Sequence, residues 1–418
     1  MSILATKNNY KYTKLACYCA YFTMSSVFSL PPLLFVTLHN MYGISYTLLG
    51  TLVLVNFCTQ LFIDLVFSFF SKHFNIKKIV RVMPLITSFG MMLYALIPML
   101  IPEYAYLGLV VSTVIFSVAS GLSEVLLSPM IAAIPSKNPQ KDMSMLHSLY
   151  AFGVFTVVLI STLFLKIFGT HNWMFLTMLL ASLPVVAAVL FMISPMPDMQ
   201  PSADVQTQKQ SRRHYGDLLL CVGCIFFGSC AEGAMSNWIS SYMENALKID
   251  KALGDVLGMA MFAVLLGLTR ILYAKFGKNI FKMLFICMIG SVICYITVGL
   301  SMNVIIAFLA CVLTGVFTSM LWPGSLIMME ENVPKAGVAA FALMAAGGDL
   351  GASVSPQLAG IIIDNVTISD FALKLSEVSG LSTEQIAIKA AMLSIAVFPM
   401  VGCVVLYATY SRFKKRKI

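Results

Sequence analysis

The sequence predicts an all-α membrane protein whose twelve transmembrane helices form two pseudo-symmetric halves of six helices each. Of its 418 residues, 59% are hydrophobic and 11% are charged, and the mean hydropathy is +0.89. A soluble protein carries about 25% charged residues. Twelve apolar runs are each long enough for a membrane crossing, which needs about 20 residues. The longest polar stretch between them separates the sixth run from the seventh.

The expected spans follow one another with short loops. In order, they cover about 15–38, 46–70, 79–101, 105–134, 143–168, 173–195, 217–243, 252–274, 280–300, 303–329, 337–363 and 386–410. Pro31 and Pro32 lie near the end of the first span. In the tenth span, Trp322 and Pro323 predict a broken helix of the kind that lines transporter sites.

The polar stretch divides the chain into an N-terminal half (1–195), a linker (196–216) and a C-terminal half (217–418). The linker is rich in Pro, Gln and Ser, a composition typical of flexible connections. It therefore predicts two six-helix units joined by a mobile segment.

The basic residues predict the orientation. Of the 27 Lys and Arg, 21 fall on the side of the termini, five fall on the other side, and Arg270 lies within the eighth span. By the positive-inside rule, this bias places both termini in the cytoplasm, with the protein in a plasma membrane of bacterial type. The net charge of +9 is then a topological signal, and no nucleic-acid partner is expected. Met1–Lys14 is polar and basic and runs into a full span, so no cleavable signal peptide is expected.

Cofactor and enzyme signals are not found in the sequence. Cys221 and Cys224 form a CxxC, but inside an apolar helix, where small core residues are the simpler interpretation. The five His show no metal-ligand spacing, and no P-loop motif occurs. We therefore expect neither a metal, nor a cofactor, nor catalysis, and any active transport would depend on an ion gradient.

Glu124 in the fourth span is the strongest candidate for function. An ionisable group within a membrane span costs about 3 kcal/mol on insertion scales and usually faces a partner or a water-filled cavity. Ser128 lies four residues on, on the same helix face, and Pro129 follows it. Glu124 is therefore predicted to bind a proton or the substrate. The alternative is a structural carboxylate satisfied by a neighbouring helix.

Further polar residues in the N-terminal half could line a cavity. His147 and Tyr150 open the fifth span, where His147 could bind substrate, relay a proton or cap the helix. Asn56 and Gln60 lie four apart on one face of the second span, and they could contact substrate or join helices.

The C-terminal half offers a matching set. Glu232, Asn237 and Trp238 lie in the seventh span, and Trp238 could stack on a sugar ring or simply pack. Asp349 and Gln357 lie on one face of the eleventh span, with Asp349 a second candidate for proton coupling.

Two charged residues are predicted to act as gates. Asp64 lies near the terminus-side end of the second span, where it could also help helices pack. Arg270, near the same end of the eighth span, could close a gate or extend its charge to the interface.

Several stretches together resemble the fucose/galactose/glucose–proton symporter family within the major facilitator superfamily. Basic turns follow the second helix of each half, as KHFNIKK (72–78) and KFGKNIFK (275–282). GLSEVLLSP (121–129) resembles the family's E-x-x-x-N-P element, with Glu124 at its acidic position. AEGAMSNW (231–238), MLWPGS (320–325) and GGDLGASVSPQLAG (347–360) resemble its elements in the seventh, tenth and eleventh spans.

This resemblance implies uptake of a small carbohydrate driven by protons, with Glu124 as the proton-responsive residue. The sequence departs from the family in two places. The family's sugar symporters carry an acidic residue in the first span, where this chain has Ser25, Ser26 and Ser29. The superfamily's loop motif has Lys72 and Asn75 where Asp and Gly are expected. The departures leave the sugar and the coupling scheme open.

The sequence thus predicts a monomeric secondary transporter for a small polar molecule, most simply a sugar, coupled to protons. Three alternatives remain at this stage. A drug or metabolite exporter has the same fold, and a non-transporting receptor would need a signalling domain that the chain lacks. A membrane-embedded enzyme would need a nucleophile–base pair or metal cluster, which the sequence does not indicate.

Overall fold

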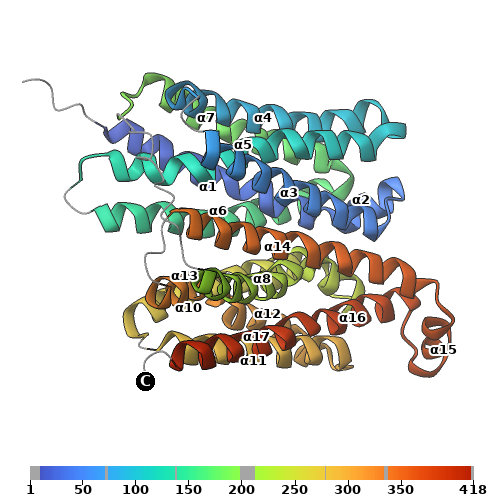
Figure 1. Cartoon of the computed structure of the whole chain (residues 1–418). Helices are drawn as coiled ribbons and strands as arrows, with labels where there is room; N and C mark the ends of the chain where they lie inside the picture. The colour runs from blue at the N-terminus through green and yellow to red at the C-terminus, as the bar shows by residue number, and fades with distance from the viewer. Residues whose placement is uncertain are drawn as a thin grey trace, which may run out of the picture.

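The computed structural model describes residues 10–70, 74–136, 139–197, 212–277, 279–333 and 338–415, and these ranges are almost entirely helical, with no strand among them. Most of the linker predicted at 196–216 lies outside them. The helices run roughly side by side in two bundles, stacked one above the other in Figure 1. The described chain begins and ends at the same end of these bundles. We call this the terminal end and the opposite one the distal end.

The first bundle contains the helices up to α7. They are α1 (Lys11–Leu33), α2 (Phe35–Tyr42), α3 (Tyr46–Phe70), α4 (Ile76–Leu100), α5 (Ala105–Ala133), α6 (Pro139–Phe168) and α7 (Trp173–Ile193), with short 3-10 turns η2 (Pro102–Tyr104) and η3 (Thr170–Asn172).

The second bundle contains the remaining helices and two π-helical turns. They are α8 (Arg212–Ser241), η4 (Tyr242–Ala246), α9 (Lys251–Leu253), η5 (Gly254–Ala260), α10 (Met261–Phe276), α11 (Ile280–Leu300), α12 (Val304–Thr318), α13 (Leu321–Asn332), α14 (Val338–Thr367), α15 (Asp370–Ser379), α16 (Thr383–Ile395) and α17 (Val397–Lys414).

The helix lengths agree with the prediction of a polytopic membrane protein. Within the described residues, nine helical segments are long and apolar enough to cross a membrane, and ten if the bent pair α1–α2 is one span. The helices α6 and α14 are not among these segments, but each is 30 residues long. The architecture is therefore consistent with twelve spans, and the all-α membrane fold is confirmed.

Two spans are interrupted. Between α1 and α2 the chain bends by 49° at Leu34. Pro31 and Pro32 precede the bend and lack the amide hydrogens that would continue the helix ladder. In the tenth span, α12 ends at Thr318 and α13 begins at Leu321, one residue before Trp322 and Pro323. Pro is tolerated in the first turn of a helix, where its missing amide has no partner to lose. The regular helix is thus interrupted for two residues, whereas Val304–Met329 remains one continuous span by length and hydropathy.

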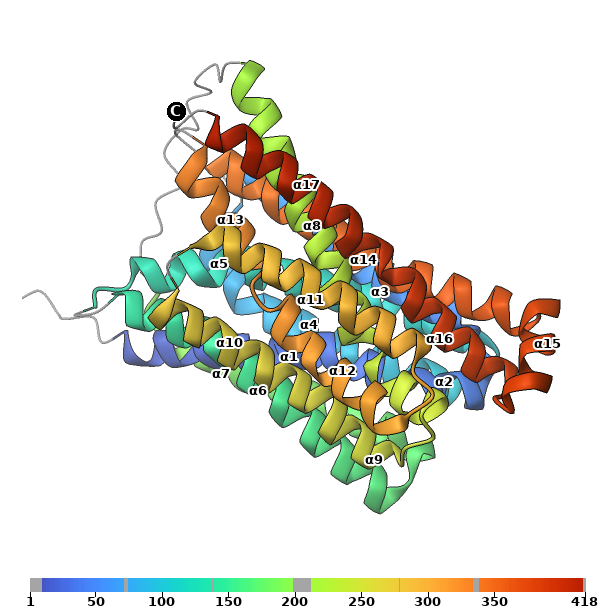
Figure 2. The ribbon, with the colours of Figure 1, turned by 90° about the horizontal axis from the view of Figure 1, so that it is seen from below.

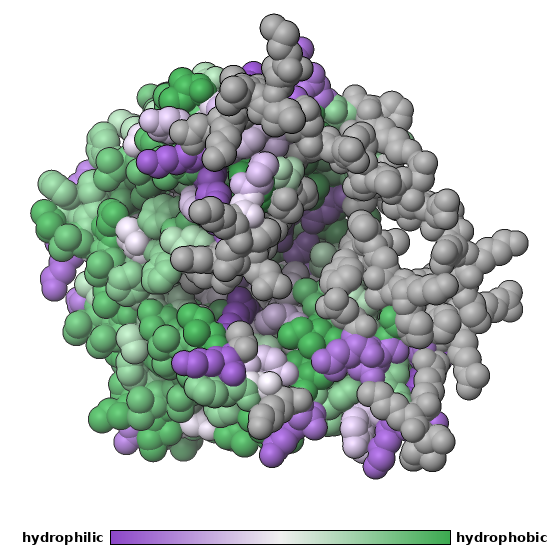
Figure 3. Space-filling model, turned by 90° about the vertical axis from the view of Figure 1, so that its left-hand side faces the viewer, coloured by the Kyte–Doolittle hydropathy of each residue, from purple (hydrophilic) through white to green (hydrophobic). Residues whose placement is uncertain are grey.

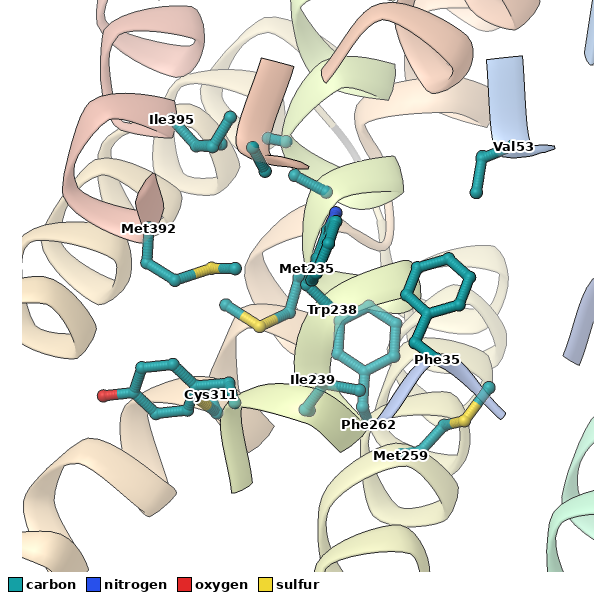
Figure 4. Packing of buried hydrophobic residues seen from close by; sticks show 14 of the residues in the cluster. Phe35, Val53, Met235, Trp238, Ile239, Met259, Phe262, Cys311, Met392 and Ile395 are labelled. Atoms are coloured by element: carbon teal, nitrogen blue, oxygen red, sulfur yellow. The ribbon is translucent and has the colours of Figure 1, made fainter. Parts of the chain in front are cut away.

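The largest buried apolar cluster joins the two bundles. Phe35 of α2, in the first bundle, lies against Trp238 of α8, in the second, with ring centroids 5.2 Å apart (Figure 4). Met235, Ile239 and Met259 extend this packing into the second bundle. A second cluster, around Met83, Leu127 and Phe191, is confined to the first bundle. The bundles therefore share apolar core around Phe35 and Trp238, close to the distal end.

Figure 2 shows the molecule from below, so that the two bundles overlap along the line of sight, with α2 and α15 toward the distal end.

Candidate functional site

A polar hollow opens at the terminal end. Figure 3 looks onto this face and shows hydrophilic side chains recessed among hydrophobic ones. Three charged side chains from the interior of helices are accessible. Glu124 of α5 is exposed, and the side chains of Arg270 and Glu232 are 40% and 25% exposed. Charges that keep their water within a membrane protein mark a solvent-filled path or site.

Glu124 interacts with side chains of four other helices. It interacts electrostatically with Tyr21 of α1 and Tyr150 of α6, and with Asp64 of α3 and Asp349 of α14. These four residues come from both bundles. Within the described residues, Glu124 makes no hydrogen bond or ion pair, so its carboxylate is available to a ligand.

Two further carboxylates, those of Asp64 and Asp349, interact electrostatically with Glu124. Asp349 is 7% exposed and, in the described part of the chain, forms neither a hydrogen bond nor an ion pair. The Oδ1 atom of Asp64 is buried without a hydrogen-bond partner there. A buried acceptor that no donor satisfies is costly, which is why such groups often have a ligand, an ion or water as partner. Asp64 was predicted to act as a gate and Asp349 to couple protons. The two carboxylates interact electrostatically with each other.

An aromatic wall adjoins Glu124. Tyr150 packs edge-on against Tyr21, with centroids 6.5 Å apart, and against Phe28, at 5.8 Å. Phe28 in turn lies 5.8 Å from Phe57 of α3. We call Tyr21, Phe28 and Tyr150 the aromatic wall.

Glu232 and Arg270 form an ion pair in the second bundle. The Nη2 atom of Arg270 lies 3.3 Å from both carboxylate oxygens of Glu232, and its Nε donates to the Ser319 carbonyl at 2.8 Å. That carbonyl lies at the break between α12 and α13. Arg270 therefore ties α10 to α8 and to the broken tenth span. Tyr150 of α6 interacts electrostatically with both members of the pair.

Asn56 and Gln60 are buried and partnered. The Oδ1 atom of Asn56 accepts from Gln60 Nε2 at 3.0 Å and from the Ser117 hydroxyl of α5 at 2.6 Å. This network joins α3 to α5, as expected for polar contacts between membrane helices. In this conformation the two side chains hold the helices α3 and α5 together.

The remaining predicted residues of the second bundle lie at different depths. Asn237 donates to the Gly233 carbonyl of its own helix at 2.8 Å. Trp238 is fully buried and donates from Nε1 to the Pro356 carbonyl at 3.0 Å. Trp322 is partly exposed, and its ring lies against Gly348 of α14. Gln357 has a buried Oε1 without a hydrogen-bond partner in the described residues.

One predicted residue cannot be placed at the site. His147 belongs to α6, but its side chain lies outside the described part of the structure, as do those of Ser128 and Pro129. The helix itself brings its neighbour Tyr150 to the hollow.

The distal end is closed by contacts between the bundles. The Asp364 carboxylate of α14 accepts from the backbone amides of Tyr46 and Thr47, at 3.0 and 2.6 Å, where α3 begins. These amides lack partners within their own helix, and a carboxylate also interacts favourably with the positive end of the helix dipole. A residue of the second bundle thus caps a helix of the first.

Lys251 makes a second contact across the bundles. Its Nζ donates to the Leu33 carbonyl at the end of α1, at 2.9 Å. It also lies 3.3 Å from Glu244 and 3.7 Å from Asp255, two carboxylates of its own bundle. Asp255 is 1% exposed and also accepts from the Ser240 hydroxyl.

The Tyr46 hydroxyl makes the third contact. It donates to Glu384 of α16 and accepts from Asn245 Nδ2 at 2.9 Å. Close backbone approach adds to the closure, because a Cβ on Gly360 would lie 2.3 Å from the Tyr46 carbonyl oxygen. We call these contacts of Asp364, Lys251, Tyr46 and Gly360 the distal closure.

At the terminal end, two ion pairs of the described residues each join helices of one bundle. Lys14 of α1 pairs with Asp142 of α6, and this hydrogen bond lowers the pKa of the Asp142 carboxyl. Arg412 of α17 pairs with the buried Asp217 of α8, at 2.6 Å. The hollow is therefore closed distally and accessible from the terminal end.

The distal closure was missed by the sequence analysis. Asp364, Glu244 and Glu384 lie close to span ends, where a charge is ordinarily solvated, and Lys251 counted only as a charge on the far side. The sequence did contain one signal for the contact of Lys251, namely Pro31 and Pro32. Prolines that interrupt a helix predict backbone carbonyls that need donors from elsewhere.

Comparison with known proteins bears on the fold. The sequence profile of the Major Facilitator Superfamily matches residues 16–356, whereas no curated protein matches the sequence significantly. A bacterial homologue of the human lysosomal transporter Spinster, in an inward-facing and occupied conformation, superposes with a TM-score of 0.80 at 12% identity, covering 98% of this chain and 99% of its own.

Two other solved structures show the same likeness. A D-xylose–proton symporter superposes with a TM-score of 0.74 at 14% identity, covering 93% of this chain and 96% of its own. The nucleoside transporter NupG superposes with a TM-score of 0.69 at 12% identity, covering 96% of this chain and 98% of its own. At these identities the likeness establishes the fold alone.

Proposed function

Because the chain belongs to the Major Facilitator Superfamily, whose members are membrane transporters, we propose that it moves a small polar molecule, a sugar, across the plasma membrane by proton-coupled alternating access. The observation that carries this proposal is the exposed Glu124, which interacts with Asp64 of its own bundle and Asp349 of the other. A carboxylate shared between two bundles can couple its occupancy to their relative position. The same fold serves a D-xylose–proton symporter.

The proposal gives each group at the hollow a role. Glu124 carries the coupled proton, and Asp349 accepts it or senses its charge from the second bundle. Asp64 and Arg270 act at the opening, where Arg270 holds the break in the tenth span. The substrate contacts are assigned to the other polar and aromatic groups, namely Asn56, Gln60, His147, Tyr150, Glu232, Asn237, Trp238, Trp322 and Gln357.

Some of these contacts require the other conformation. Trp238 and Asn56 are buried here, so a substrate could meet them only after the distal closure opens. Alternating access provides that change, because the two halves of such transporters rock about a site near the middle of the membrane.

The orientation and organisation follow the same proposal. The excess of Lys and Arg on the side of the termini favours a cytoplasmic terminal end, so that the hollow faces the cytoplasm in this conformation. Residues 1–195 and 217–418 form the two moving halves, residues 196–216 connect them, and the protein acts as a monomer without a cofactor.

Transport into proteoliposomes tests the proposal. Purified protein is reconstituted and given an imposed pH gradient, and the uptake of a panel of radiolabelled hexoses and pentoses is measured in the wild type and in Glu124→Gln. We expect at least one sugar to accumulate in the wild type. In the variant, accumulation should fall to the background while exchange of labelled for unlabelled sugar continues.

The matched control is Glu103→Gln, the same substitution at an exposed position of η2, which should transport as the wild type does. Accumulation by Glu124→Gln at the wild-type level would contradict the coupling role. A panel in which no sugar enters, with the protein folded by thermal melting, would contradict the sugar assignment.

A further inference from the structure

Among the described residues, the charged groups around Glu124 are mostly acidic. Asp64, Glu124, Glu232 and Asp349 carry carboxylates, and the cation that interacts with this group there is Arg270. Arg270 is engaged by Glu232. Within the described part of the chain, Asp64, Glu124 and Asp349 therefore have no ion-pair partner, and a single transported proton neutralises at most one of them.

Asp349 adds an observation of a different kind. It is 7% exposed, has no partner in the described residues, and interacts electrostatically with Glu124 and Asp64. Burial of an uncompensated carboxylate is unfavourable unless a charge or a donor reaches it. A neutral sugar can donate hydroxyl hydrogens, but it leaves the charge in place.

The aromatic wall supplies what an organic cation needs. Tyr21 and Tyr150 interact electrostatically with Glu124, and Phe28 packs on Tyr150. Aromatic faces attract ammonium groups by about 0.5–2 kcal/mol, more strongly when the site is desolvated. A carboxylate that interacts with two tyrosine rings is thus a combination suited to an alkylammonium group, whereas a phosphate or carboxylate ligand would be repelled.

From this geometry we infer that the transported molecule carries a protonated amine, held between the Glu124 carboxylate and the aromatic wall, with its hydroxyl groups toward the second bundle. The inference rests on the proposed function and sharpens it, since an amine-bearing sugar or polyol satisfies both, with Glu124 holding the proton and the ammonium group at different steps of the cycle. The charge at Asp349 then draws the bound ammonium toward the second bundle as the halves move.

Matched pairs of ligands test the charge by itself. Isothermal titration calorimetry on the purified full-length protein compares glucosamine with glucose and N-acetylglucosamine, N-methylglucamine with sorbitol, and choline with 3,3-dimethylbutanol. Each pair differs mainly by the positive charge. We expect the charged member of at least one pair to bind at least tenfold more tightly.

Two variants locate the binding. Glu124→Gln should remove the preference for the charged member, and Tyr150→Leu should weaken it severalfold while leaving neutral ligands unaffected. Glu103→Gln serves as the matched control for the first and should keep the preference. The comparison of ligands in the wild type needs no variant, so the test survives a variant that fails to fold.

The outcomes separate the two proposals. Equal binding of charged and neutral members, or failure of every amine to bind, overturns the inference of a cationic substrate. If neutral sugars bind or are accumulated in that case, the proposed sugar transport stands. If amines bind but no sugar of either kind is transported, the cation site stands and the sugar assignment falls.

Discussion

The two ends of the molecule hold their bundles in different ways. At the distal end, Asp364 and Lys251 of the second bundle bind backbone groups of the first. At the terminal end, the pairs Lys14–Asp142 and Asp217–Arg412 each stay within one bundle. The polar contacts between bundles described here thus lie at the distal end, whereas these two terminal pairs each act within a bundle. A change at the distal end should alter the conformation, whereas one at the terminal end should alter only stability.

The largest expected effect comes from Gly360→Val in the distal closure. Its Cβ would lie 2.3 Å from the Tyr46 carbonyl oxygen and 2.8 Å from its carbon, and backbone atoms cannot rotate away. Overpacking of this kind costs about 1–3 kcal/mol, which corresponds to roughly a tenfold to hundredfold shift toward the distally open state. Hydrogen–deuterium exchange of a peptide spanning 43–52 should rise accordingly.

Gly267→Val is the matched control. A Cβ at Gly267 of α10 would meet nothing within 4 Å, so exchange at 43–52 should stay at the wild-type level. Unchanged exchange in Gly360→Val would show that the close approach of α14 and α3 does not govern opening.

A smaller effect is expected for Asp364→Ala. The substitution leaves the amides of Tyr46 and Thr47 without their acceptor and removes a charge from the helix end, a loss of about 1–2 kcal/mol. The same amides should exchange roughly tenfold faster. Asp364→Asn, which keeps an acceptor but no charge, should fall between the two. Asp370→Asn at an exposed position of α15 is the control, and equal exchange in all four proteins would refute the cap.

Tyr46→Phe should have a milder effect. It removes the hydroxyl that links Glu384 and Asn245 to α3, and a hydrogen bond of this kind contributes about 1 kcal/mol net. We expect a fewfold increase in exchange at 43–52 and little change in thermal stability. Tyr104→Phe removes an equivalent hydroxyl from an exposed position on η2 and should have no effect.

The smallest effect is expected at the terminal end, for Asp142→Asn. Breaking the pair with Lys14 should lower stability by less than about 1 kcal/mol and leave exchange at 43–52 unchanged. Since pairing lowers the pKa of Asp142, its contribution is present at neutral pH and disappears as the pH falls through that lowered pKa. Melting temperatures of wild type and variant should therefore differ at pH 7 and converge in acid. A shift in exchange at the distal end would contradict the separation of roles.

The helices were largely predictable, because a span is determined by local hydrophobicity. The ninth span was expected at about 280–300 and is found at Ile280–Leu300. The last span begins earlier than expected, at Thr383, where Ser382 and Gln385 form a capping box. The amphipathic helix α15 was not predicted, since it lies between spans and follows the N-cap Ser369.

The contacts were far less predictable. Glu232 and Arg270 were assigned separate roles. In the structure they form an ion pair between two helices, although the residues are 38 positions apart in sequence. Trp238 was predicted either to stack on a sugar ring or to pack, and it is buried in this conformation; hydropathy alone does not show which way a residue of an apolar helix points. Glu124 was identified because a charge in a span is unusual wherever its side chain lies.

The bend between α1 and α2 has a consequence for how this protein can vary. Lys251 binds the Leu33 carbonyl, an atom that every amino acid supplies. Substituting Leu33 therefore leaves the acceptor in place, and only Lys251 or the prolines that end the helix can be altered to remove it. Across evolution or in a mutational screen, this contact should therefore constrain position 251 directly, whereas position 33 is constrained only by the packing of its fully buried side chain.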